Sequence, residues 1–588
     1  MDPGERMFAL SQLLRFLKPF RKEVCLGPIF KWIEAVFDLI LPLIMARILD
    51  VGVAARDGAY VLRMSVWMFA ISALGLGCAL ICQYFAARAS QGFGTVIRNT
   101  LFRHIQSLSH TEIDQLGTPS LITRITNDVN QLQVAVAMAI RLAVRAPFLV
   151  IGATVMAMLL DFRLSCVFLL AAPLIAGTLY LVMSRSVPFY RIIQQKLDGL
   201  GRITRENLSG VRVIRAFSRQ ETEKRRFAQA SADLRTDSIR VGRMAALLNP
   251  MTACIVNLAI VAILWFGGIR VQIGALSQGQ VIAFVNYLNQ ILLAMIAAAN
   301  LIVIFTKAFA SGQRVQEVLN TEPSVVPPRS TAAPNPVPGA PKVVFDHVDF
   351  SYAGAEKPML SDICFSVQAG QTVGIIGGTG AGKSTLCQLI PRFYDVTGGQ
   401  IRIDGIPLQQ IPPSDLRARI GYVPQRAVLF TGTLRKNMQW ADPNATDEQI
   451  WHALETAQAA SFVRAMPQGL DTPIAQGGQN LSGGQRQRLT IARALIGSPE
   501  LLILDDSASA LDFATDAALR SALHRQTREQ TVFLISQRVH AIAQADQILV
   551  LDEGRLVGCG THATLLQTCE LYAQIVASQR QTETGVGA

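Results

Sequence analysis

The sequence predicts an α-helical transmembrane domain with six spans and long cytoplasmic helical extensions, followed by an α/β P-loop domain. Its 588 residues are too many for one domain, so two or three structural units are expected. Half of the residues are hydrophobic and 16% are charged, with a mean hydropathy of +0.33, which is too apolar for a soluble protein. The run Gly377–Ser384 fits the phosphate-loop pattern G-x-x-x-x-G-K-[ST].

The net charge of +12 first suggests a nucleic-acid partner. The basic residues, however, lie mainly in the loops of the apolar half, where an excess of arginine and lysine marks cytoplasmic loops beside anionic lipid. We therefore expect a lipid bilayer and no nucleic acid as partner. The nine cysteines include no C-x-x-C pair, which indicates small core side chains in place of disulfides or metal ligands. The first 20 residues lack the pattern of a cleavable signal.

Six apolar stretches are each close to the length of about 20 residues that a helix needs to cross a bilayer. They lie at about 24–49, 62–86, 134–160, 163–185, 244–267 and 281–306. Ahead of them, residues 11–21 alternate apolar and basic side chains at helical spacing. This pattern favours a helix in the lipid headgroup layer, with a soluble amphipathic turn as the alternative.

The first apolar stretch carries three charged residues, Lys31, Glu34 and Asp38, on one helix face. Because an unpaired charge in lipid is strongly unfavourable, this face must point inward or pair internally. Two interpretations remain open: a polar patch on a substrate route, or an internally satisfied ion pair.

The connections 87–133 and 186–243 are long, rich in arginine and helical in period, whereas the others are short. The positive-inside rule places these two connections and both termini in the cytoplasm. We expect the membrane to be the plasma (inner) membrane, with the ATPase domain in the cytoplasm. The helical period predicts spanning helices that continue past the bilayer. Residues 112–128 and 206–217 place glycine turns between helices and suggest docking points, although pattern alone favours solvated loops there.

A proline-rich segment at 321–341 separates two parts of different character. Proline removes a backbone donor and fixes φ, so no helix or central strand is expected through this segment. The boundary predicts a transmembrane domain at 1–320, a linker at 321–341 and a nucleotide-binding domain at 342–588.

The phosphate loop lies between a strand-like run, Thr372–Ile376, and a helix-like run, Ser384–Ile390. Glycines let the N–H groups of the loop converge on phosphate oxygens, and the N-terminus of the following helix adds partial positive charge. Lys383 is expected to reach the β- and γ-phosphates, and Ser384 to bind Mg²⁺. The predicted nucleotide contacts of the loop are Gly377, Gly378, Thr379, Gly380, Ala381, Gly382, Lys383, Ser384 and Thr385.

Further polar residues follow predicted strands or open a predicted helix. Gln425 comes after one strand and can touch a metal ion or its water, and Asp505 ends the buried strand 501–505, which suits an Mg²⁺ contact. The run Ser482–Gln485 opens a helix at 486–495 and offers a second phosphate-binding surface, free to serve a nucleotide held by another subunit. The remaining candidates are Tyr352 at the end of the strand 342–352, Asp506, the segment Ser509–Asp512, and Gln537 after the strand 531–536.

The order of phosphate loop, Gln425, LSGGQ, LLILD and SALD resembles an ATP-binding cassette domain, and the six spans ahead of it resemble an ABC exporter half-transporter. The resemblance implies an ATPase coupled to transport, in which two halves hold two ATP molecules with Mg²⁺ between their cassettes. It implies that Tyr352 stacks on adenine, and that coupling helices lie near 112–117 and 210–217. It also implies that ATP held by the other subunit is contacted by Ser482, Gly483, Gly484, Gln485 and Asp512.

Three positions depart from the family pattern. Asp506 stands where the family has a glutamate as general base, and Gln537 stands where it has a histidine. The aspartate carboxylate is set back by about 1.5 Å, roughly one C–C bond, and a misplacement of about 1 Å can lower a rate about 10²-fold. The amide of Gln537 cannot carry a proton or a positive charge. Gln476 replaces a glutamate ahead of LSGGQ.

These departures predict that the chain's own site binds ATP but hydrolyses it slowly, and that the working pump is a heterodimer with a different half-transporter. Spans with few fixed charges favour amphipathic or apolar cargo, such as a drug, a lipid or a hydrophobic peptide. The alternatives are a nucleotide-gated regulatory membrane subunit without net pumping, and a slow homodimeric exporter.

Overall fold

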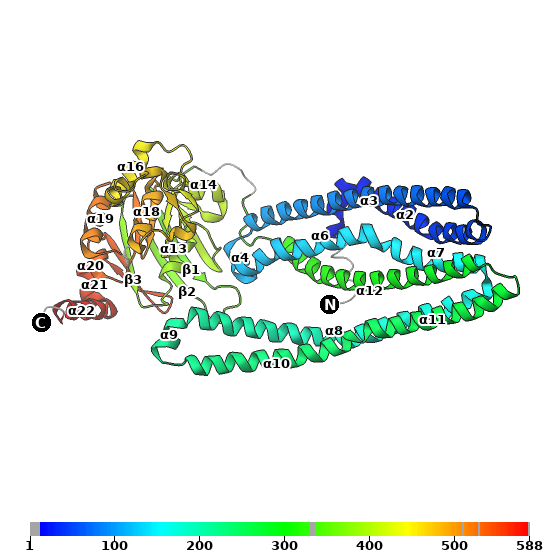
Figure 1. Ribbon diagram of the computed structural model, residues 1–588. Helices are drawn as coiled ribbons and strands as arrows, with labels where there is room; N and C mark the ends of the chain where they lie inside the picture. Colours follow the sequence, from blue (N-terminus) through cyan, green and yellow to red (C-terminus); the bar gives the residue numbers. More distant parts are fainter. Residues whose placement is uncertain (1–11, 329–334, 508–510, 527–529, 586–588) are drawn as a thin grey trace. The chain divides into compact units, whose positions relative to one another are not determined.

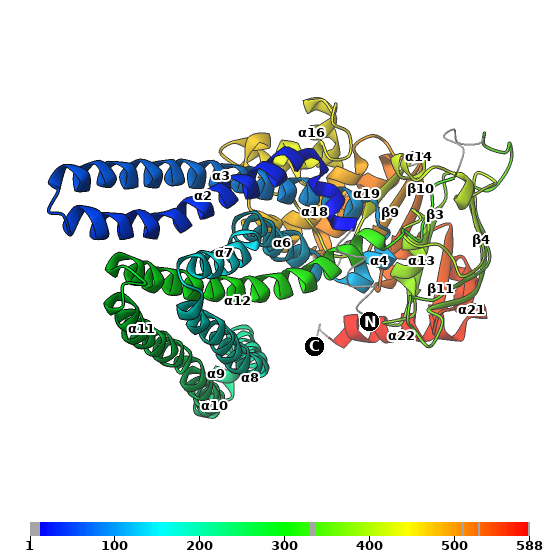
Figure 2. The same ribbon diagram turned by 90° about the vertical axis from the view of Figure 1, so that its right-hand side faces the viewer.

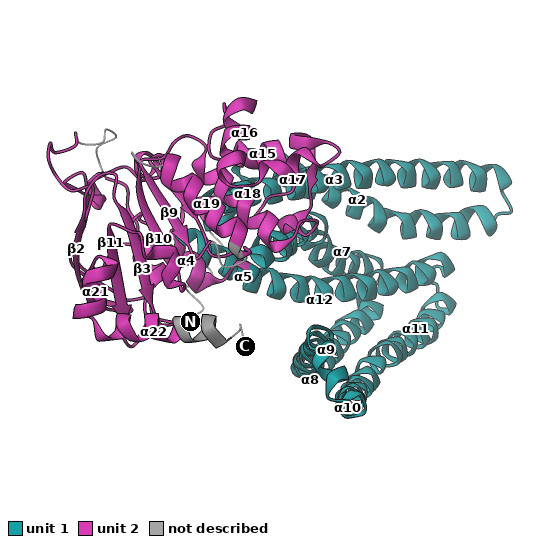
Figure 3. Cartoon of the chain, turned by 90° about the vertical axis from the view of Figure 1, so that its left-hand side faces the viewer, with its two compact units in different colours: residues 1–104, 119–320 teal, residues 105–118, 321–588 magenta. Residues whose placement is uncertain are grey.

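The computed structural model describes residues 12–328, 335–507, 511–526 and 530–585 (Figure 1). The chain forms two compact units, the first from residues 1–104 and 119–320 and the second from residues 105–118 and 321–588 (Figure 3). A short segment from the apolar half, residues 105–118, is therefore part of the C-terminal unit. Ser11, at the start of the expected headgroup helix, lies outside the described residues, and the stretch that follows it is helical from residue 12.

Helices alone make up the described part of the first unit. A helix pairs most of its backbone N–H and C=O groups within itself, and its apolar side chains face the lipid, which is what a bilayer requires of a spanning segment. The elements are η1 (Arg15–Phe20), α2 (Arg21–Arg47), η2 (Ile48–Val53), α3 (Gly58–Ser107), α5 (Thr118–Thr123), η3 (Arg124–Asp128), α6 (Val129–Met138), η4 (Ala139–Ala143), α7 (Arg145–Leu160), α8 (Phe162–Ser209), α9 (Val211–Ala216), α10 (Gln220–Ala246), α11 (Leu248–Gln272) and α12 (Gln278–Asn320).

Five helical segments within the described residues are long and apolar enough to cross a membrane. They cover 58–107, 118–160, 162–209, 220–272 and 278–320. The first predicted span, 24–49, is confirmed as a helix, α2, but its charged residues keep it outside this set. The presence of six spans therefore stays a prediction, and it depends on whether α2 crosses the membrane.

The spanning helices run beyond the predicted apolar stretches. The 48 residues of α8, at about 1.5 Å each, extend over roughly 72 Å, more than twice the ~30 Å hydrocarbon core. Helix α10 packs beside α8, and α12 packs beside α7 (Figures 1 and 2). The stretch predicted as one span at 134–160 lies within the single apolar helical segment 118–160, in which the helix widens locally at 139–143 between α6 and α7.

The second unit is built around two main sheets. One has the strand order β12-β11-β3-β10-β9-β6, in which β12 alone is antiparallel to its neighbour, and the other has the order β2-β1-β4-β5. The strands are β1 (Val343–Phe350), β2 (Leu360–Val367), β3 (Thr372–Gly377), β4 (Gly398–Ile403), β5 (Ile406–Pro407), β6 (Ile420–Val423), β7 (Gly432–Thr433), β8 (Pro473–Ile474), β9 (Leu501–Asp505), β10 (Thr531–Ile535), β11 (Gln547–Asp552) and β12 (Arg555–Gly560).

The centre of the larger sheet consists of β3, β10 and β9, whose apolar runs are buried on both faces as parallel strands require. The carboxyl ends of these strands lie at one edge of the sheet, which is where ligands bind in parallel α/β folds. Helices of the unit are α4 (His110–Leu116), α13 (Lys383–Leu389), α14 (Pro413–Ala418), α15 (Leu434–Met438), α16 (Asp447–Thr456), α17 (Ala460–Arg464), α18 (Gly483–Leu495), α19 (Phe513–Gln526), α20 (Val539–Ile542), α21 (His562–Thr568) and α22 (Glu570–Gly585).

The strands predicted at 372–376, 501–505 and 531–536 are confirmed as β3, β9 and β10. The described parts of the proline-rich segment, 321–328 and 335–341, contain neither helix nor strand, as predicted. The helix predicted from Arg486 begins earlier, at Gly483, because Ser482 and Gln485 form a capping box.

Candidate functional site

The phosphate loop joins β3 to α13 in a conformation that depends on glycine. Gly380 and Gly382 have φ of +83° and +91°, which side chains other than glycine rarely adopt. A Cβ at Gly377 would lie 2.1 Å from the backbone oxygen of Leu551, and one at Gly382 would lie 2.6 Å from Leu360. The loop therefore has the tight curvature that lets backbone N–H groups converge on a phosphate.

Lys383 is mostly buried at the start of α13. Its Nζ donates to the carbonyl oxygens of Gly377, at 3.0 Å, and Gly378, at 2.6 Å. Burial lowers the pKa of the Lys383 ammonium, and the nearby carboxylates of Asp506 and Asp505 partly oppose this effect. The ammonium thus sits inside the curl of the loop, where the sequence predicts the β- and γ-phosphates.

Asp505, at the end of β9, is 2% exposed and accepts a hydrogen bond of 2.8 Å from the Ser384 hydroxyl. Burial raises the pKa of the Asp505 carboxyl, and the Ser384 hydrogen bond lowers it in part. A hydroxyl and a carboxylate in contact are oxygen ligands of the kind that Mg²⁺ takes together with nucleotide phosphates. No cluster of three acidic, histidine or cysteine ligands occurs among the described residues, so this hydroxyl–carboxylate pair is the best candidate for a metal contact.

Asp506 and Gln425 come together beside this pair. Asp506 has φ of 45°, and its backbone N–H donates to Ile535 at 3.2 Å, which fixes the start of the loop after β9. Burial raises the pKa of the Asp506 carboxyl, whereas a hydrogen bond from Gln425 and the charges of Lys383 and Arg538 lower it. Two acidic groups in one small space are therefore held by different partners.

A cavity of about 190 Å³ is lined by residues from several predicted parts of the site. Gln537, which follows β10, lines it together with groups from β9 and the phosphate loop. The full lining comprises Met359, Thr379, Gly380, Gly382, Lys383, Ser384, Thr385, Gln425, Asp505, Asp506, Ile535 and Gln537. The structure thus brings the predicted base position, the predicted switch position and the metal-ligand pair to one place.

Gln579, on α22, holds the backbone on both sides of Arg538. Its Nε2 donates to the carbonyl of Gln537 at 2.7 Å, and its Oε1 accepts from the N–H of Val539 at 2.8 Å. Sequence reasoning missed this residue because it lies 42 positions beyond the loop, in a segment with no motif.

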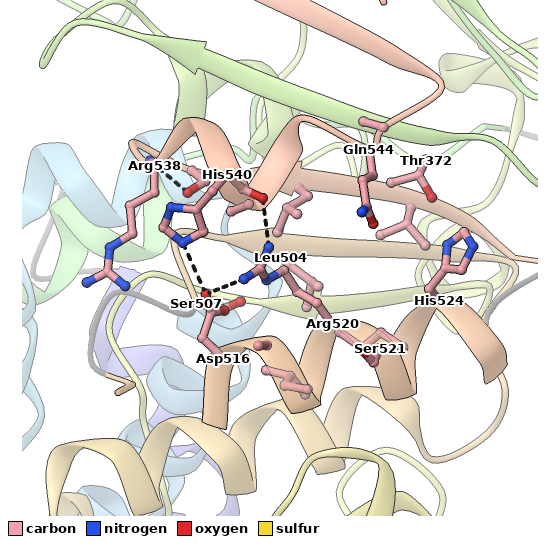
Figure 4. Close-up of a pocket in the computed structure, with 18 of the residues that line it drawn as sticks. Thr372, Leu504, Ser507, Asp516, Arg520, Ser521, His524, Arg538, His540 and Gln544 are labelled. Atoms are coloured by element: carbon pink, nitrogen blue, oxygen red, sulfur yellow. Dashed lines mark hydrogen bonds and ion pairs between the residues drawn. The ribbon is translucent and has the colours of Figure 1, made fainter. Parts of the chain in front are cut away.

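Sequence reasoning also missed a group of polar residues formed by Asp516 and Arg520 of α19 and His540 of α20 (Figure 4). Asp516 is 1% exposed and lies 3.2 Å from Arg520 and 3.6 Å from His540. Arg520 also donates to the backbone carbonyl of His540 at 2.7 Å. The four-residue spacing of Asp516 and Arg520 is the one signal in the sequence that could have indicated part of this contact.

Tyr352 lies just past β1, next to the phosphate-loop helix. Its hydroxyl is 3.0 Å from the Thr385 hydroxyl, and its ring packs edge-on against Phe350 and Tyr394, with centroids at 4.9 and 5.4 Å. Adenine stacking by Tyr352 stays a prediction, and the structure places the ring close enough to the loop for the prediction to be tested.

The LSGGQ run does not line the phosphate-loop cavity. Ser482 and Gln485 cap α18 reciprocally, with Gln485 Oε1 accepting from the Ser482 N–H at 2.9 Å. A separate cavity of about 400 Å³ contains Gly483 and shares Gln425 with the phosphate-loop cavity. Its lining is Gln425, Arg426, Ala427, Gly477, Gln479, Gly483, Arg486 and Gln487.

Asp512 precedes α19 and accepts hydrogen bonds from the Thr515 N–H and hydroxyl, both at 2.9 Å, which lower the pKa of its carboxyl. Ser509 and Ala510, in the same predicted segment, lie outside the described residues. Asp512 is exposed, which leaves its carboxylate accessible.

The first predicted docking point is confirmed as a helix, α4, that packs within the second unit. Tyr394 donates to Asp114 at 2.7 Å, and the ring of His110 lies edge-on to Phe393 at 4.7 Å. The N–H of Ser324 donates to Glu112 at 3.2 Å, so α4 also fixes the start of the linker. The second predicted point is confirmed as a short helix, α9, none of whose residues is buried, and its docking stays a prediction.

The chain matches the family model "ABC transporter transmembrane region" at residues 24–295 and the model "ABC transporter" at residues 360–509. It is 38% identical to an uncharacterized ABC transporter ATP-binding protein of Mycobacterium tuberculosis (strain CDC 1551 / Oshkosh), covering 98% of this chain and 100% of the relative. It is 30% identical to the ATP-dependent lipid A-core flippase of Vibrio vulnificus (strain YJ016), covering 96% of each chain.

Among solved structures, a bacterial Atm1-family ABC exporter with ATP bound superposes with a TM-score of 0.78 at 25% identity, covering 95% of this chain and 98% of the other. The phosphate-loop geometry, the fused membrane and cassette units and these matches agree with one another. The chain belongs to the ABC transporter family, as an exporter-type polypeptide whose membrane domain is fused to an ATPase domain that couples ATP hydrolysis to transport.

Proposed function

We propose that this chain is one half of a heterodimeric exporter of the plasma (inner) membrane, and that its own ATP site binds Mg²⁺ and ATP but hydrolyses ATP slowly. The observation that carries the proposal is one cavity that holds Lys383, Ser384 and Asp505 beside Asp506 and Gln537. The side chains expected to bind phosphate and Mg²⁺, namely Lys383, Ser384, Gln425 and Asp505, all line this cavity. The two groups that would activate and hold the attacking water are the ones that differ.

The physical argument concerns reach and charge. The carboxylate of Asp506 ends about one C–C bond, ~1.5 Å, short of a glutamate carboxylate on the same backbone. A general base must lie within hydrogen-bond distance of the proton it removes, so a setback of about 1 Å lowers the rate about 10²-fold. The Gln537 amide can still donate a hydrogen bond to a phosphate, but it supplies neither a proton nor a positive charge.

The LSGGQ run supports the second half of the proposal. Because it does not line this chain's phosphate-loop cavity, its capped helix N-terminus is free to contact a phosphate from another subunit. We propose that Ser482–Gln485 and Asp512 complete the active ATP site of a partner that supplies the missing glutamate and histidine. Hydrolysis in that site then resets the pair after export.

We propose amphipathic or hydrophobic cargo, taken from the cytoplasm or the inner leaflet. The described residues of the spanning helices are mostly apolar and include few charged side chains. Some exposed residues carry amides, such as Asn286 and Asn289 of α12. One relative is named a lipid A-core flippase, which agrees with an amphipathic molecule as cargo.

The subunit composition is tested by purifying the tagged chain from membranes of the organism that naturally produces it. Mass spectrometry of the intact complex then identifies and counts the subunits. We expect one copy of this chain with one copy of a half-transporter that carries Glu and His at the two divergent positions. A complex of two copies of this chain would contradict the heterodimer.

A second function, a nucleotide-gated regulatory subunit without net pumping, is favoured by the same weak Asp506 and Gln537 pair beside an intact phosphate loop. Inside-out vesicles that contain the purified complex separate the two. ATP-dependent accumulation of a fluorescent amphipathic dye is expected of an exporter. Nucleotide binding without any accumulation, in a complex that changes conformation on binding, would favour the regulator.

A further inference from the structure

A proline removes one backbone hydrogen bond from α2 next to a charged residue. Pro42 has no N–H, so the carbonyl of Asp38, four residues earlier, loses its helical donor. Gln290 of α12 supplies a replacement, because its Nε2 donates to the Asp38 carbonyl at 2.9 Å. Tyr287, one turn before, donates to the carbonyl of Leu39 at 2.7 Å. Two side chains of α12 thus hold α2 near Pro42. The bond to the Asp38 carbonyl also fixes the orientation of the Gln290 amide.

The charges on the same face of α2 are paired internally. Lys31 lies 2.7 Å from Glu34, and Arg145, at the start of α7, lies 2.9 Å from Asp38. The internal ion pairing that the sequence offered as one interpretation is therefore present, and a substrate role for the same face stays a prediction. Two cations and two anions leave this group without net charge.

The polar network is nevertheless incomplete. Arg145 Nε and Gln290 Oε1 are buried and have no hydrogen-bond partner within the described residues. An unpaired buried polar atom is destabilising, so a group that could reach both atoms would be bound favourably. One atom is a donor and the other is an acceptor, which calls for a group that does both.

These residues border a cavity of about 300 Å³, the lower end of the size range of ligand pockets. The polar side of the cavity is formed by Asp38, Arg145 and Gln290, each from a different helix. The apolar side is formed by Leu142, Ala146, Leu149, Leu293, Ala294 and Ala297. A cavity lined by both polar and apolar side chains can accept an amphipathic molecule.

We propose that this cavity binds cargo through an uncharged head group that both donates and accepts hydrogen bonds, such as a primary amide or a hydroxyl on an apolar chain. The Asp38 and Arg145 charges cancel, so a charged head group would enter without a counter-charge, which is unfavourable inside a membrane. The inference rests on the proposed export of amphipathic cargo, and it names the chemistry of the head group that the membrane domain selects.

The test uses dodecanamide with a photoreactive diazirine on its chain, and the full-length protein in lipid nanodiscs together with any subunit that co-purifies. Labelled peptides are located by mass spectrometry, with unlabelled dodecanamide or dodecylamine as competitor at equal concentration in the lipid. We expect labels on the segments that line the cavity, which belong to α2, η4, α7 and α12, and competition by the amide about tenfold stronger than by the cationic amine. Equal competition by the two, or labels elsewhere, would overturn the proposal.

Ala297→Leu fills the cavity without touching its polar side, and Ala298→Leu is the matched control on the next residue, which does not line the cavity. We expect Ala297→Leu to lower specific labelling at least about tenfold, and Ala298→Leu to leave it within about twofold. If Ala297→Leu does not fold, Leu293→Trp replaces it, since Leu293 is 68% exposed and tolerates a larger side chain. Unchanged labelling in the cavity-filling variant would overturn the site.

The outcomes for this site and for the exporter are separable. Specific labelling without dye accumulation in vesicles would leave the site standing and remove the proposed function. Dye accumulation without specific labelling would remove the site and leave the proposed function standing.

Discussion

At the scale of single residues, the backbone of Asp506 matters as much as its length. Its φ of 45° lies in the left-handed region, which aspartate tolerates better than longer side chains do. The short carboxylate therefore suits this backbone, although under the proposed function it is too short to reach the attacking water. Gln425 reaches the carboxylate and partly offsets the effect of burial on its pKa.

Gln425→Leu is expected to make the hydrolysis proposed for this site more sensitive to acid. A base must be ionised to act, so activity is lost as pH falls through the raised pKa of Asp506, and removal of the Gln425 hydrogen bond raises that pKa further. The acid limb of the rate profile for phosphate release should move to higher pH. Gln468→Leu, an exposed glutamine in the same unit, is the control and should leave the profile unchanged.

At the scale of elements, the second unit is held together by contacts that cross long distances in the chain. Helix α4 comes from the apolar half of the sequence, yet it packs through Tyr394 and Phe393 of the cassette. Burial and the Asp114 hydrogen bond raise the pKa of Tyr394 far above its usual value, so its hydroxyl stays a donor at every working pH. The contact fixes α4 within the second unit.

Tyr394→Phe removes the hydrogen bond to Asp114 and keeps the ring contacts. We expect nucleotide affinity to remain within about twofold and the ratio of cargo moved to ATP hydrolysed to fall, because one hydrogen bond contributes about 1 kcal/mol to holding α4. Vesicle transport and phosphate release, measured on the same preparation, give this ratio. Tyr572→Phe, which loses a hydrogen bond to His562 instead, is the matched control, and an equal fall in both variants would count against a specific role of α4.

Glu500, just before β9, accepts from Arg419 at 2.9 and 2.6 Å and from Lys342 at 2.5 Å, which ties the start of β9 to the starts of β6 and β1. Arg419, followed by Lys342, lowers the pKa of Glu500 from 4.5 to about 2. The pKa is lower in the folded state, so this stabilisation is present above about pH 4.5 and is lost as pH falls toward about 2.

Glu500→Gln is therefore expected to lower the Tm of the full-length protein at pH 7, with a difference from the unaltered protein that shrinks below about pH 4.5. Scanning fluorimetry across pH measures both Tm values. Glu356→Gln, an exposed glutamate with no ion pair in the described structure, should show no difference at either pH. A difference that is independent of pH would remove the electrostatic explanation.

At the scale of the whole molecule, the sequence predicted what depends on short-range pattern. Continuous apolar runs predicted the buried parallel strands, and the glycine spacing at 377–382 predicted the loop that curls around Lys383. The sequence could not predict Gln579 or the pairing of Arg145 with Asp38, because these contacts join residues 42 and 107 positions apart that carry no motif. The charged face of α2 was visible, but its partners depended on which helices pack against it.

The most direct test of the proposed slow site uses nanodiscs that hold two copies of this chain and no other subunit, at saturating Mg²⁺ and ATP, and measures phosphate release. We expect slow turnover from the unaltered chain and an increase of about 10²-fold in the double variant Asp506→Glu with Gln537→His, with a smaller increase in each single variant. Addition of Lys383→Ala to the double variant should remove the gain, which controls for contaminating ATPases. A double variant no faster than the unaltered chain would contradict the claim that these two side chains limit hydrolysis.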